Sequence, residues 1–210
     1  MKNWNRFLPF ALILVGTGVL VLLLNGFEAK YPSRAVDGSA WDENWTMLGA
    51  VLGVEEPGNG LVLLDNNTAL AADDTYLATW ASGGAIPYVN ADGDDAEIYE
   101  AQIYLLLMGC KEAANARTNV DGWIARTGET YAVTDTRAET YNGQEYTVLT
   151  YACGSDTNPY SRGISAFTVF ENYTVSVELT CLEEYAGDEE AVLTAFLTGC
   201  HYSADIGANS

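Results

Sequence analysis

The sequence predicts an α+β fold, with an antiparallel β-sheet meander packed with two main helices and preceded by an N-terminal transmembrane helix. Three observations predict this class. An uncharged apolar run lies near the start of the chain, apolar residues recur at helical spacing over 98–114, and strand-like segments separated by short turns fill most of 129–182. Consecutive strands joined by turns favour antiparallel pairing, because parallel strands need long crossover connections.

The N-terminal segment is basic first and apolar next. Lys2 and Arg6 precede the run 7–24, which contains no charged side chain. A helix of that length measures about 27 Å, which is just enough to span the apolar core of a bilayer. The pattern is typical of a signal-anchor or of a cleavable signal peptide. The apolar run is longer than that of most signal peptides, and residues 25–29 after it make a poor cleavage site, because Phe27 stands where a cut after Ala29 needs a small residue. Both features favour the uncleaved anchor, while secretion after cleavage remains the alternative.

The distribution of charge gives the expected topology. All 29 acidic residues follow the apolar run, whereas two of the 9 basic residues precede it, in agreement with the positive-inside rule. We therefore expect a single-pass protein of the cell membrane with its N-terminus in the cytoplasm. The expected parts are listed in chain order: a cytoplasmic tip (1–6), a transmembrane signal-anchor (7–24), a stalk (25–40), an extracytoplasmic α+β domain (41–202) and a tail (203–210).

The overall composition excludes several classes of protein. The formal net charge is −20, so the chain cannot neutralise the phosphates of a nucleic acid or bind an anionic membrane surface through a basic patch. Hydrophobic residues make up 49% of the chain and aromatic residues 11%, which excludes a disordered acidic tail. Membrane contact is therefore expected only through the N-terminal helix.

The first part of the domain mixes strand and helix signals. Short apolar runs at 47–54 and 60–64 flank a Pro-Gly turn cluster, and 75–81 has the composition of a strand, which 86–89 could continue after a turn. Apolar residues then follow at i, i+3, i+4 spacing, which predicts a helix over 98–114. Asp94 or Asp95 would cap its start, and a further helical turn is expected around Trp123.

The second part of the domain has a stronger strand pattern. Strands are predicted at 129–135, 145–153, 164–170 and 174–182. An Asn-Gly hairpin turn falls at 141–144, and Gly187-Asp188 caps a final helix with an apolar stripe that ends at Cys200. In the last strand, alternation predicts a sheet with one more polar face. The polar face carries Ser176, Glu178 and Thr180, and the other carries Val175, Val177, Leu179 and Cys181.

The second part also resembles a known family. The runs that carry the resemblance are N-G-Q-E-Y-T-V-L-T-Y at 142–151, A-F-T-V-F at 166–170 and Y-T-V-S-V-E-L-T-C at 173–181, followed by an acidic start to the closing helix. Over about 144–202 this pattern resembles the Mog1/PsbP-like proteins. The resemblance implies an antiparallel sheet between helices, an α/β/α sandwich. It also implies a non-catalytic role, because known members are mostly accessory or binding proteins, and it transfers no site residue.

The four cysteines, Cys110, Cys153, Cys181 and Cys200, are disulfide candidates because all lie in the part expected outside the cytoplasm. We pair Cys110 with Cys200 by preference, since both fall near the ends of the two predicted helices. Cys153 and Cys181 remain, but in a meander they would be two strand spacings apart, about 9–10 Å, whereas a disulfide needs Cα atoms within about 7 Å. The alternative is four buried, reduced thiols.

Residue types that perform catalysis or bind metals are sparse. The acidic segment 92–97 fails the spacing of an EF-hand, so it is expected to be a solvated loop. His201 is the single histidine, which weakens zinc and triad chemistry. The pairs at 183–184 and 189–190 could in principle hydrolyse glycosides, but they flank a helix start where acidic residues are favoured anyway. No catalytic, cofactor-binding or metal-binding residue is therefore predicted, and no cofactor is expected.

Aromatic residues in or beside loops offer a binding surface, although core packing explains most of them equally well. The candidates are Trp41, Trp45, Tyr88, Tyr160 and Tyr185. The expected function is a membrane-anchored, extracytoplasmic, non-catalytic binding or accessory domain whose protein partner the sequence does not identify. Two alternatives stay open, namely an extracytoplasmic carboxylate-based hydrolase and a self-associating structural envelope protein.

Overall fold

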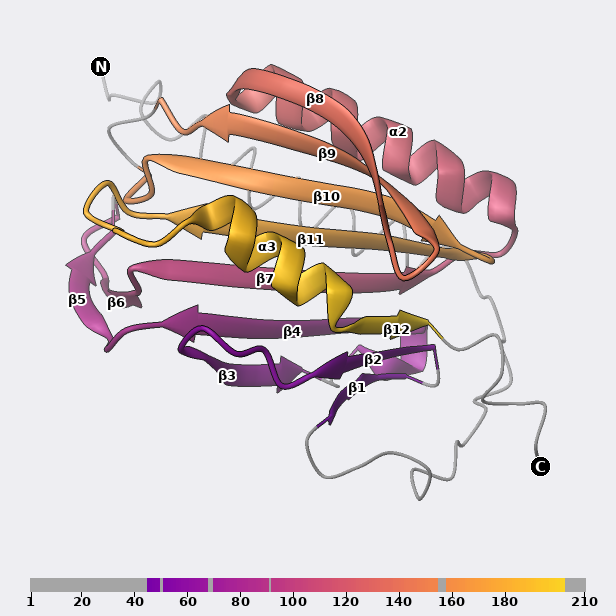
Figure 1. Cartoon of the computed structure of the whole chain (residues 1–210), viewed down its shortest axis with the longest axis horizontal. Helices are drawn as coiled ribbons and strands as arrows, with labels where there is room; N and C mark the ends of the chain where they lie inside the picture. Colours follow the sequence, from indigo (N-terminus) through magenta and orange to yellow (C-terminus); the bar gives the residue numbers. More distant parts are fainter. Residues whose placement is uncertain (1–44, 50, 68–69, 91, 155–157, 203–210) are drawn as a thin grey trace, which may run out of the picture. The chain divides into compact units, whose positions relative to one another are not determined.

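A computed structural model describes residues 45–49, 51–67, 70–90, 92–154 and 158–202 (Figure 1). The chain divides into two units, 1–33 and 34–210, and every described residue belongs to the second. The expected cytoplasmic tip, transmembrane helix, stalk and tail lie outside the described residues. Within the described part of the chain, no helix is both long enough and apolar enough to cross a membrane.

A seven-stranded antiparallel sheet forms the centre of the described structure (Figure 1). Its strands, in spatial order, are β3 (Leu61–Asn67), β4 (Thr75–Ser82), β7 (Ala101–Gly109), β11 (Tyr173–Cys181), β10 (Arg162–Phe170), β9 (Gln144–Ala152) and β8 (Ala132–Tyr141). Every neighbouring pair is antiparallel. The predicted α+β class with an antiparallel sheet is therefore confirmed.

Smaller elements complete the fold. Strands β1 (Trp45–Leu48), β2 (Leu52–Glu55) and β12 (Cys200–Tyr202) form a three-stranded sheet, while β5 (Ile86–Val89) and β6 (Asp95–Ile98) form a separate hairpin. A short 3₁₀ helix, η3 (Ala71–Asp73), precedes β4.

The two long helices cover opposite faces of the large sheet. Helix α3 (Glu189–Thr198) lies across the front of the sheet in Figure 1, and its buried residues join the main core with Trp80 and Val148. Helix α2 (Ala113–Thr130) packs on the other face, where Val120 meets Leu149. Successive residues of a strand point to opposite faces, so neighbours 148 and 149 belong to different layers. We call these surfaces the α3 face and the α2 face.

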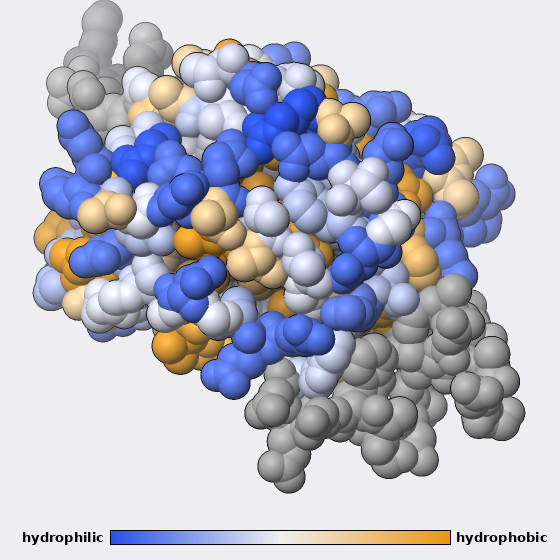
Figure 2. Space-filling view, in the orientation of Figure 1, coloured by the Kyte–Doolittle hydropathy of each residue, from blue (hydrophilic) through white to orange (hydrophobic). Residues whose placement is uncertain are grey.

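The α3 face is largely polar on its outer surface. Figure 2 shows hydrophilic residues over most of it, with hydrophobic residues in small separate patches. The main core lies beneath, and the buried side chains that β7 and β11 contribute to it are Ala101, Ile103, Leu105, Leu107, Val175, Val177, Leu179 and Cys181. The predicted division of the last strand into an apolar face and a more polar face is confirmed by this core.

The predicted helix over 98–114 is wrong, because this segment ends β6, forms β7 and the following turn, and reaches only the first two residues of α2. In β7, Leu105 is fully buried on the α3 face, whereas Leu106 and Met108 lie on the α2 face. A central strand with apolar residues on both faces loses its alternating pattern. Its leucines then fall at helical spacing by coincidence, and the intended cap, Asp95, instead begins β6.

Other predicted elements agree better with the structure. The strand predicted at 75–81 is β4, and the last three predicted strands match β9, β10 and β11 within a few residues. At the start of α3, Asp188 accepts a hydrogen bond from Ala191 N, as expected of a cap. The turn between β8 and β9 has positive φ at Asn142 and Gly143, as an Asn-Gly hairpin requires. The strand predicted at 129–135 begins later, because α2 continues through Thr130. The helical turn expected around Trp123 is the middle of α2.

The predicted Cys110–Cys200 disulfide is wrong, because both cysteines are buried, free thiols. Cys110 follows β7 on the α2 face, where Asn119 Nδ2 donates to its Sγ at 3.3 Å. Cys200 begins β12 and belongs to the core on the α3 face. The sheet therefore separates the two sulfurs.

Cys153 and Cys181 are also free and buried. Ser161 lies between them, since Cys153 N donates to Ser161 O at 2.8 Å and Ser161 N donates to Cys181 O at 3.0 Å. Two strand spacings are about 9–10 Å, beyond the reach of a disulfide. The alternative of four reduced thiols therefore describes the structure.

Candidate functional site

A carboxylate lies on the α2 face of the central strand. Glu178 is in the middle of β11, where its cross-strand neighbours are Tyr104 on β7 and Ser165 on β10. Its side chain is half-buried, Ser165 is buried, and Tyr104 remains 39% exposed. Glu178 is therefore placed among packed side chains but remains open to solvent beside Tyr104. We call the carboxylate and the side chains around it the Glu178 site.

Tyr151 reaches this carboxylate from two strands away. Its hydroxyl donates to Glu178 Oε1 at 2.7 Å and lies 3.2 Å from Ser165 Oγ. Strand β10 lies between the two strands, and Gly163 is the residue opposite Tyr151. A Cβ at Gly163 would lie 2.6 Å from the ring of Tyr151. The missing side chain therefore lets the phenol lie flat across β10.

The end of α2 contributes a second aromatic ring. Tyr131 follows the last residue of the helix and stacks on Tyr151, with ring centroids 4.5 Å apart and planes 9° from parallel. The C-terminal end of a helix carries partial negative charge and favours cations. The helix thus adds both an aromatic ring and an electrostatic preference to the Glu178 site.

A hydrogen-bonded chain forms the opposite side of the site. Tyr160 donates through its hydroxyl to Gln102 Oε1 at 2.6 Å, and Gln102 Nε2 donates to the hydroxyl of Tyr104 at 2.8 Å. Gln102 is buried and lies directly across the strand pair from Thr180. Because the oxygen of Tyr104 already accepts this bond, its own proton is available for another partner.

Thr180 lies two residues after Glu178 on the same face of β11. It is 7% exposed, and its Oγ1 has no hydrogen-bond partner among the described residues. Its cross-strand neighbours are Gln102 and Gly163. A buried hydroxyl without a partner costs stability, so it marks a place where a ligand or water would gain a contact.

The negative charge of Glu178 alters its neighbours. Burial first and the nearby Glu178 carboxylate second together raise the pKa of Tyr131 to about 12. Burial and the same carboxylate also raise the pKa of Tyr104 and of Tyr151. These phenols are neutral hydrogen-bond donors at pH 7, which suits a site with a single negative charge.

Three of the four thiols, those of Cys153, Cys181 and Cys200, have raised pKa values. Burial raises the pKa of Cys153 to about 11, and Glu178 acts in the same direction. Burial likewise raises the pKa of Cys181 to about 12 and that of Cys200 above its ordinary value. Because the thiolate is the reactive form, these buried thiols are unreactive at neutral pH.

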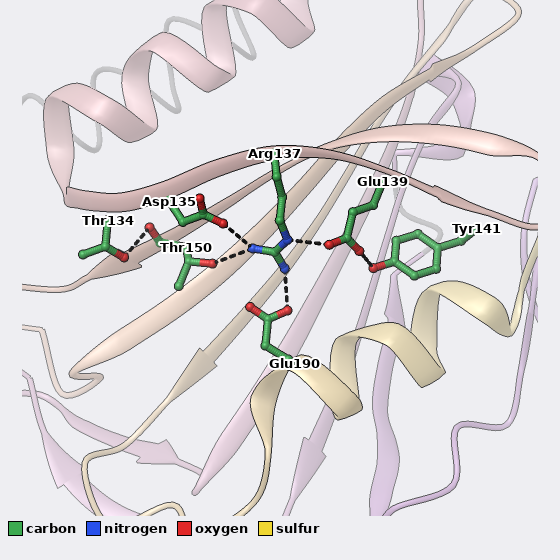
Figure 3. Close-up of polar contacts among 7 residues, drawn as sticks. All are labelled: Thr134, Asp135, Arg137, Glu139, Tyr141, Thr150 and Glu190. Atoms are coloured by element: carbon green, nitrogen blue, oxygen red, sulfur yellow. Dashed lines mark hydrogen bonds and ion pairs between the residues drawn. The ribbon is translucent and has the colours of Figure 1, made fainter.

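The two arginines on the α3 face serve a different purpose. Arg137 on β8 binds Asp135 and Glu139 on its own strand and Glu190 on α3, and it donates to Thr150 Oγ1 at 3.1 Å (Figure 3). Figure 3 shows Glu190 pointing from the first turn of α3 toward the guanidinium group. This cluster ties the helix to the edge of the sheet.

Arg162 on β10 holds the other glutamate of this pair. Its Nε donates to both carboxylate oxygens of Glu189, at 2.8 and 3.0 Å, and its terminal nitrogens donate to the carbonyls of Leu182 and Tyr185 at 2.9 Å each. The acidic pair at 189–190 is therefore engaged in docking α3. The pair at 183–184 lies exposed in the preceding loop.

The other residues singled out from the sequence are scattered. His201 lies beside Trp45, with ring centroids 4.9 Å apart, and its Nε2 is 3.4 Å from Glu55. The acidic segment 92–97 spans the β5–β6 turn, where Asn90 Oδ1 accepts hydrogen bonds from the backbone of Asp92 and Asp94. Among the described residues, no group of three or more His, Cys, Asp or Glu side chains could hold a metal ion.

The aromatic residues considered for a binding surface are also scattered over the structure. Only Tyr160 belongs to the Glu178 site. Tyr185 packs against the main core, Tyr88 lies on the β5–β6 hairpin, and Trp41 lies outside the described residues. Sequence reasoning missed Glu178 as a site residue, although the polar alternation of the last strand was the signal that could have found it.

None of the ion pairs among the described residues includes Glu178, since they join Arg137, Arg162 and His201 to other carboxylates. Chemically, the arrangement is one carboxylate, four tyrosines and the buried hydroxyls of Ser165 and Thr180. It offers negative charge, aromatic faces and hydrogen-bond acceptors. Negative charge beside aromatic rings attracts a cation.

Comparisons with known proteins add a weak likeness. No protein-family profile matches the chain, and no curated protein sequence matches it. Among solved structures, the chain is similar to the solution structure of cyanobacterial PsbP (CyanoP) from Synechocystis sp. PCC 6803. The two are 12% identical, and the match covers 70% of this chain and 96% of that chain with a TM-score of 0.38. The resemblance to PsbP-like proteins expected from the sequence is confirmed as a weak one.

Proposed function

We propose that this protein is a membrane-anchored, extracytoplasmic, non-catalytic binding or accessory domain with a Mog1/PsbP-like α/β/α sandwich fold, and that the Glu178 site is where it binds a ligand. The observation that carries the proposal is the half-buried carboxylate of Glu178, which lies among tyrosines and has no basic partner in the described part of the chain. A ligand of opposite charge would stabilise a partly buried charge that has no basic partner.

Several features support binding over hydrolysis. Glycoside hydrolysis needs two carboxyl groups at a defined separation, and the Glu178 site contains one. The adjacent pair Glu189 and Glu190 is engaged by Arg162 and Arg137. The buried thiols of Cys153 and Cys181 have raised pKa values and are poor nucleophiles.

The membrane anchor and the location are proposed from the sequence pattern at 2–24. A topology test uses the full chain in its native membrane, with an amine-reactive reagent that cannot cross the bilayer. The proposal expects Lys30 and Lys111 to be labelled from outside and Lys2 only after the membrane is opened. Labelling of Lys2 in intact cells would contradict this orientation.

The binding role is tested with a thermal-shift screen of the full chain in a non-ionic detergent. The panel contains organic cations, anions and neutral sugars, together with chromogenic glycosides and esters. The proposal expects compounds that raise the melting temperature of the wild type but not of Glu178→Gln. Glu145→Gln is the matched control, because it removes the same charge from an exposed position on β9. Turnover of a chromogenic substrate that is lost in Glu178→Gln would favour the hydrolase instead.

Self-association is a second candidate function, favoured by the edge strand β3. This strand ends the order of the large sheet and exposes Val62, Leu63 and Leu64 by 63%, 41% and 42%. An exposed apolar edge is a template for strand pairing with another chain. Light scattering of the full chain tests it by comparison with Val62→Lys. If the edge carries self-association, the charged variant is smaller than the wild type, and equal sizes would reject this role for β3.

A further inference from the structure

We infer that the ligand of the Glu178 site is a primary alkylammonium ion, an inference that rests on the proposed binding function. The ammonium group would bind Glu178 and Thr180, and its alkyl chain would lie against the tyrosine rings. Three properties of the site support this class of ligand, namely its charge, its unfilled hydrogen bonds and its aromatic walls.

The charge of the site calls for a cation. Glu178 accepts a hydrogen bond from Tyr151, but among the described residues no lysine, arginine or histidine forms an ion pair with it. The C-terminal end of α2 at Tyr131 adds negative potential. The net charge of −20 attracts cations to the protein as a whole.

The acceptor atoms of the site favour a cation that has several N–H donors. Thr180 Oγ1 is a buried acceptor without a partner in the described structure. Residues two apart on a strand lie about 7 Å apart at Cα, and a nitrogen that bonds two oxygens at about 2.9 Å each spans up to about 6 Å. A primary ammonium has three donors, so it can bond Glu178 and Thr180 together and still reach a third acceptor.

The walls of the site suit an alkyl chain next to the charge. Tyr131 stacks on Tyr151, whose ring also lies over Gly163, so the aromatic face left beside Glu178 is the outer face of Tyr131. A cation close to an aromatic face is attracted by the ring. Tyr104 is 39% exposed, so the site is accessible from solvent beside its ring. A quaternary ammonium would gain the aromatic contact but could not donate to Thr180.

The experiment measures binding to the full chain in a non-ionic detergent and phosphate buffer by isothermal titration calorimetry. The probe is butylammonium chloride, with butyltrimethylammonium chloride and 1-butanol as comparison compounds. Saturable binding of one butylammonium per chain is expected, with the other two compounds at least about tenfold weaker. Glu178→Gln should weaken butylammonium binding at least about tenfold, because it removes a hydrogen bond between charged groups.

Two further variants make the test specific. Thr180→Val keeps the shape of the side chain and removes a hydroxyl that has no partner, so it should fold and should weaken butylammonium binding roughly threefold to tenfold. The same variant should leave butyltrimethylammonium binding unchanged. Glu145→Gln removes an equal charge at a distance and should keep the affinity of the wild type.

Three results would overturn the inference. They are the absence of butylammonium binding by folded wild type, equal affinity in Glu178→Gln, and equal affinity for the quaternary ion. If the thermal-shift screen finds a Glu178-dependent ligand that is not an amine, the inference fails and the proposed binding function stands. If no compound in that screen depends on Glu178, both fail.

Discussion

The hydroxyl of Tyr151 on β9 donates a 2.7 Å hydrogen bond to Glu178 on β11, although strand β10 lies between them. The bond is possible because Gly163, the residue of β10 that the phenol crosses, has no side chain. One glycine therefore allows an aromatic ring to cover a carboxylate in the middle of the sheet. The same ring carries the stacked Tyr131, so this contact organises the Glu178 site.

Replacing Gly163 with alanine should disrupt this arrangement. The new Cβ would lie 2.6 Å from the ring of Tyr151, which must then move away from Glu178. We expect Gly163→Ala to lower the free energy of unfolding by about 1–3 kcal/mol, the usual cost of overpacking. Urea unfolding followed by circular dichroism measures this change.

Gly128→Ala is the matched control for that substitution. Gly128 lies in α2, it is exposed, and a Cβ there meets nothing within 4 Å. Alanine is the better helix former by about 1 kcal/mol, so this variant should be more stable than the wild type. A Gly163→Ala protein as stable as the wild type would show that the phenol does not cross β10 closely.

Arg137→Gln should loosen the attachment of α3. The substitution leaves Asp135, Glu139 and Glu190 close together without their shared positive charge. We expect a loss of about 1–2 kcal/mol in the free energy of unfolding and faster hydrogen exchange in α3. Arg117→Gln, at an exposed position on α2 and outside these ion pairs, should leave both quantities unchanged. Unchanged exchange in α3 for Arg137→Gln would contradict the docking role.

The same cluster predicts a dependence of stability on acid. A hydrogen bond from Tyr141, followed by one from Arg137, lowers the pKa of Glu139 from its ordinary 4.5. A carboxyl group whose pKa is lower in the folded state stabilises the fold above its ordinary pKa, and this contribution is lost as the pH falls below it. Glu139→Gln should therefore be less stable than the wild type at pH 7, and the difference should shrink between about pH 5 and pH 3.

Urea midpoints measured across this pH range test the prediction for Glu139. Glu145→Gln removes the same charge without touching Arg137 and should follow the wild type at every pH. A stability gap between Glu139→Gln and the wild type that stays constant from pH 7 to pH 3 would show that the ion pair is not the cause.

The cysteines should behave as free thiols even in protein purified without a reductant. Alkylation of the unfolded chain, followed by mass spectrometry, should modify all four cysteines. In the folded chain at pH 8, Cys153 and Cys181 should react slowly, because they are buried and their pKa values are raised to about 11 and about 12. Modification of two or fewer cysteines in the unfolded chain would show that at least one disulfide forms and would contradict the assignment of free thiols.

The sequence was most informative where one face of a strand is polar or where a turn has special chemistry. Asn142 and Gly143 predicted the β8–β9 hairpin, and Asp188 predicted the start of α3, because both depend on local backbone geometry. Strand β7 was misassigned as helix, because both of its faces are covered and its Leu105, Leu106 and Leu107 hide the alternation.

The Glu178 site was harder to predict, since its residues come from separate strands. The polarity of Glu178 and Thr180 on one face of the last strand was visible, but the arrival of Tyr151 and Tyr131 depends on strand order and on Gly163. The cysteine pairing failed for a related reason, because the face on which each sulfur lies is set by the whole sheet.

The most direct test of the Glu178 site is the position of a bound ligand. Intermolecular nuclear Overhauser effects between butylammonium and the full chain, recorded in a deuterated non-ionic detergent, give that position. We predict contacts from the methylene protons of butylammonium to the ring protons of Tyr104 and Tyr131, and their loss in Glu178→Gln. Contacts confined to other residues, or contacts that persist in Glu178→Gln, would contradict the assignment of Glu178 as the ligand-binding carboxylate.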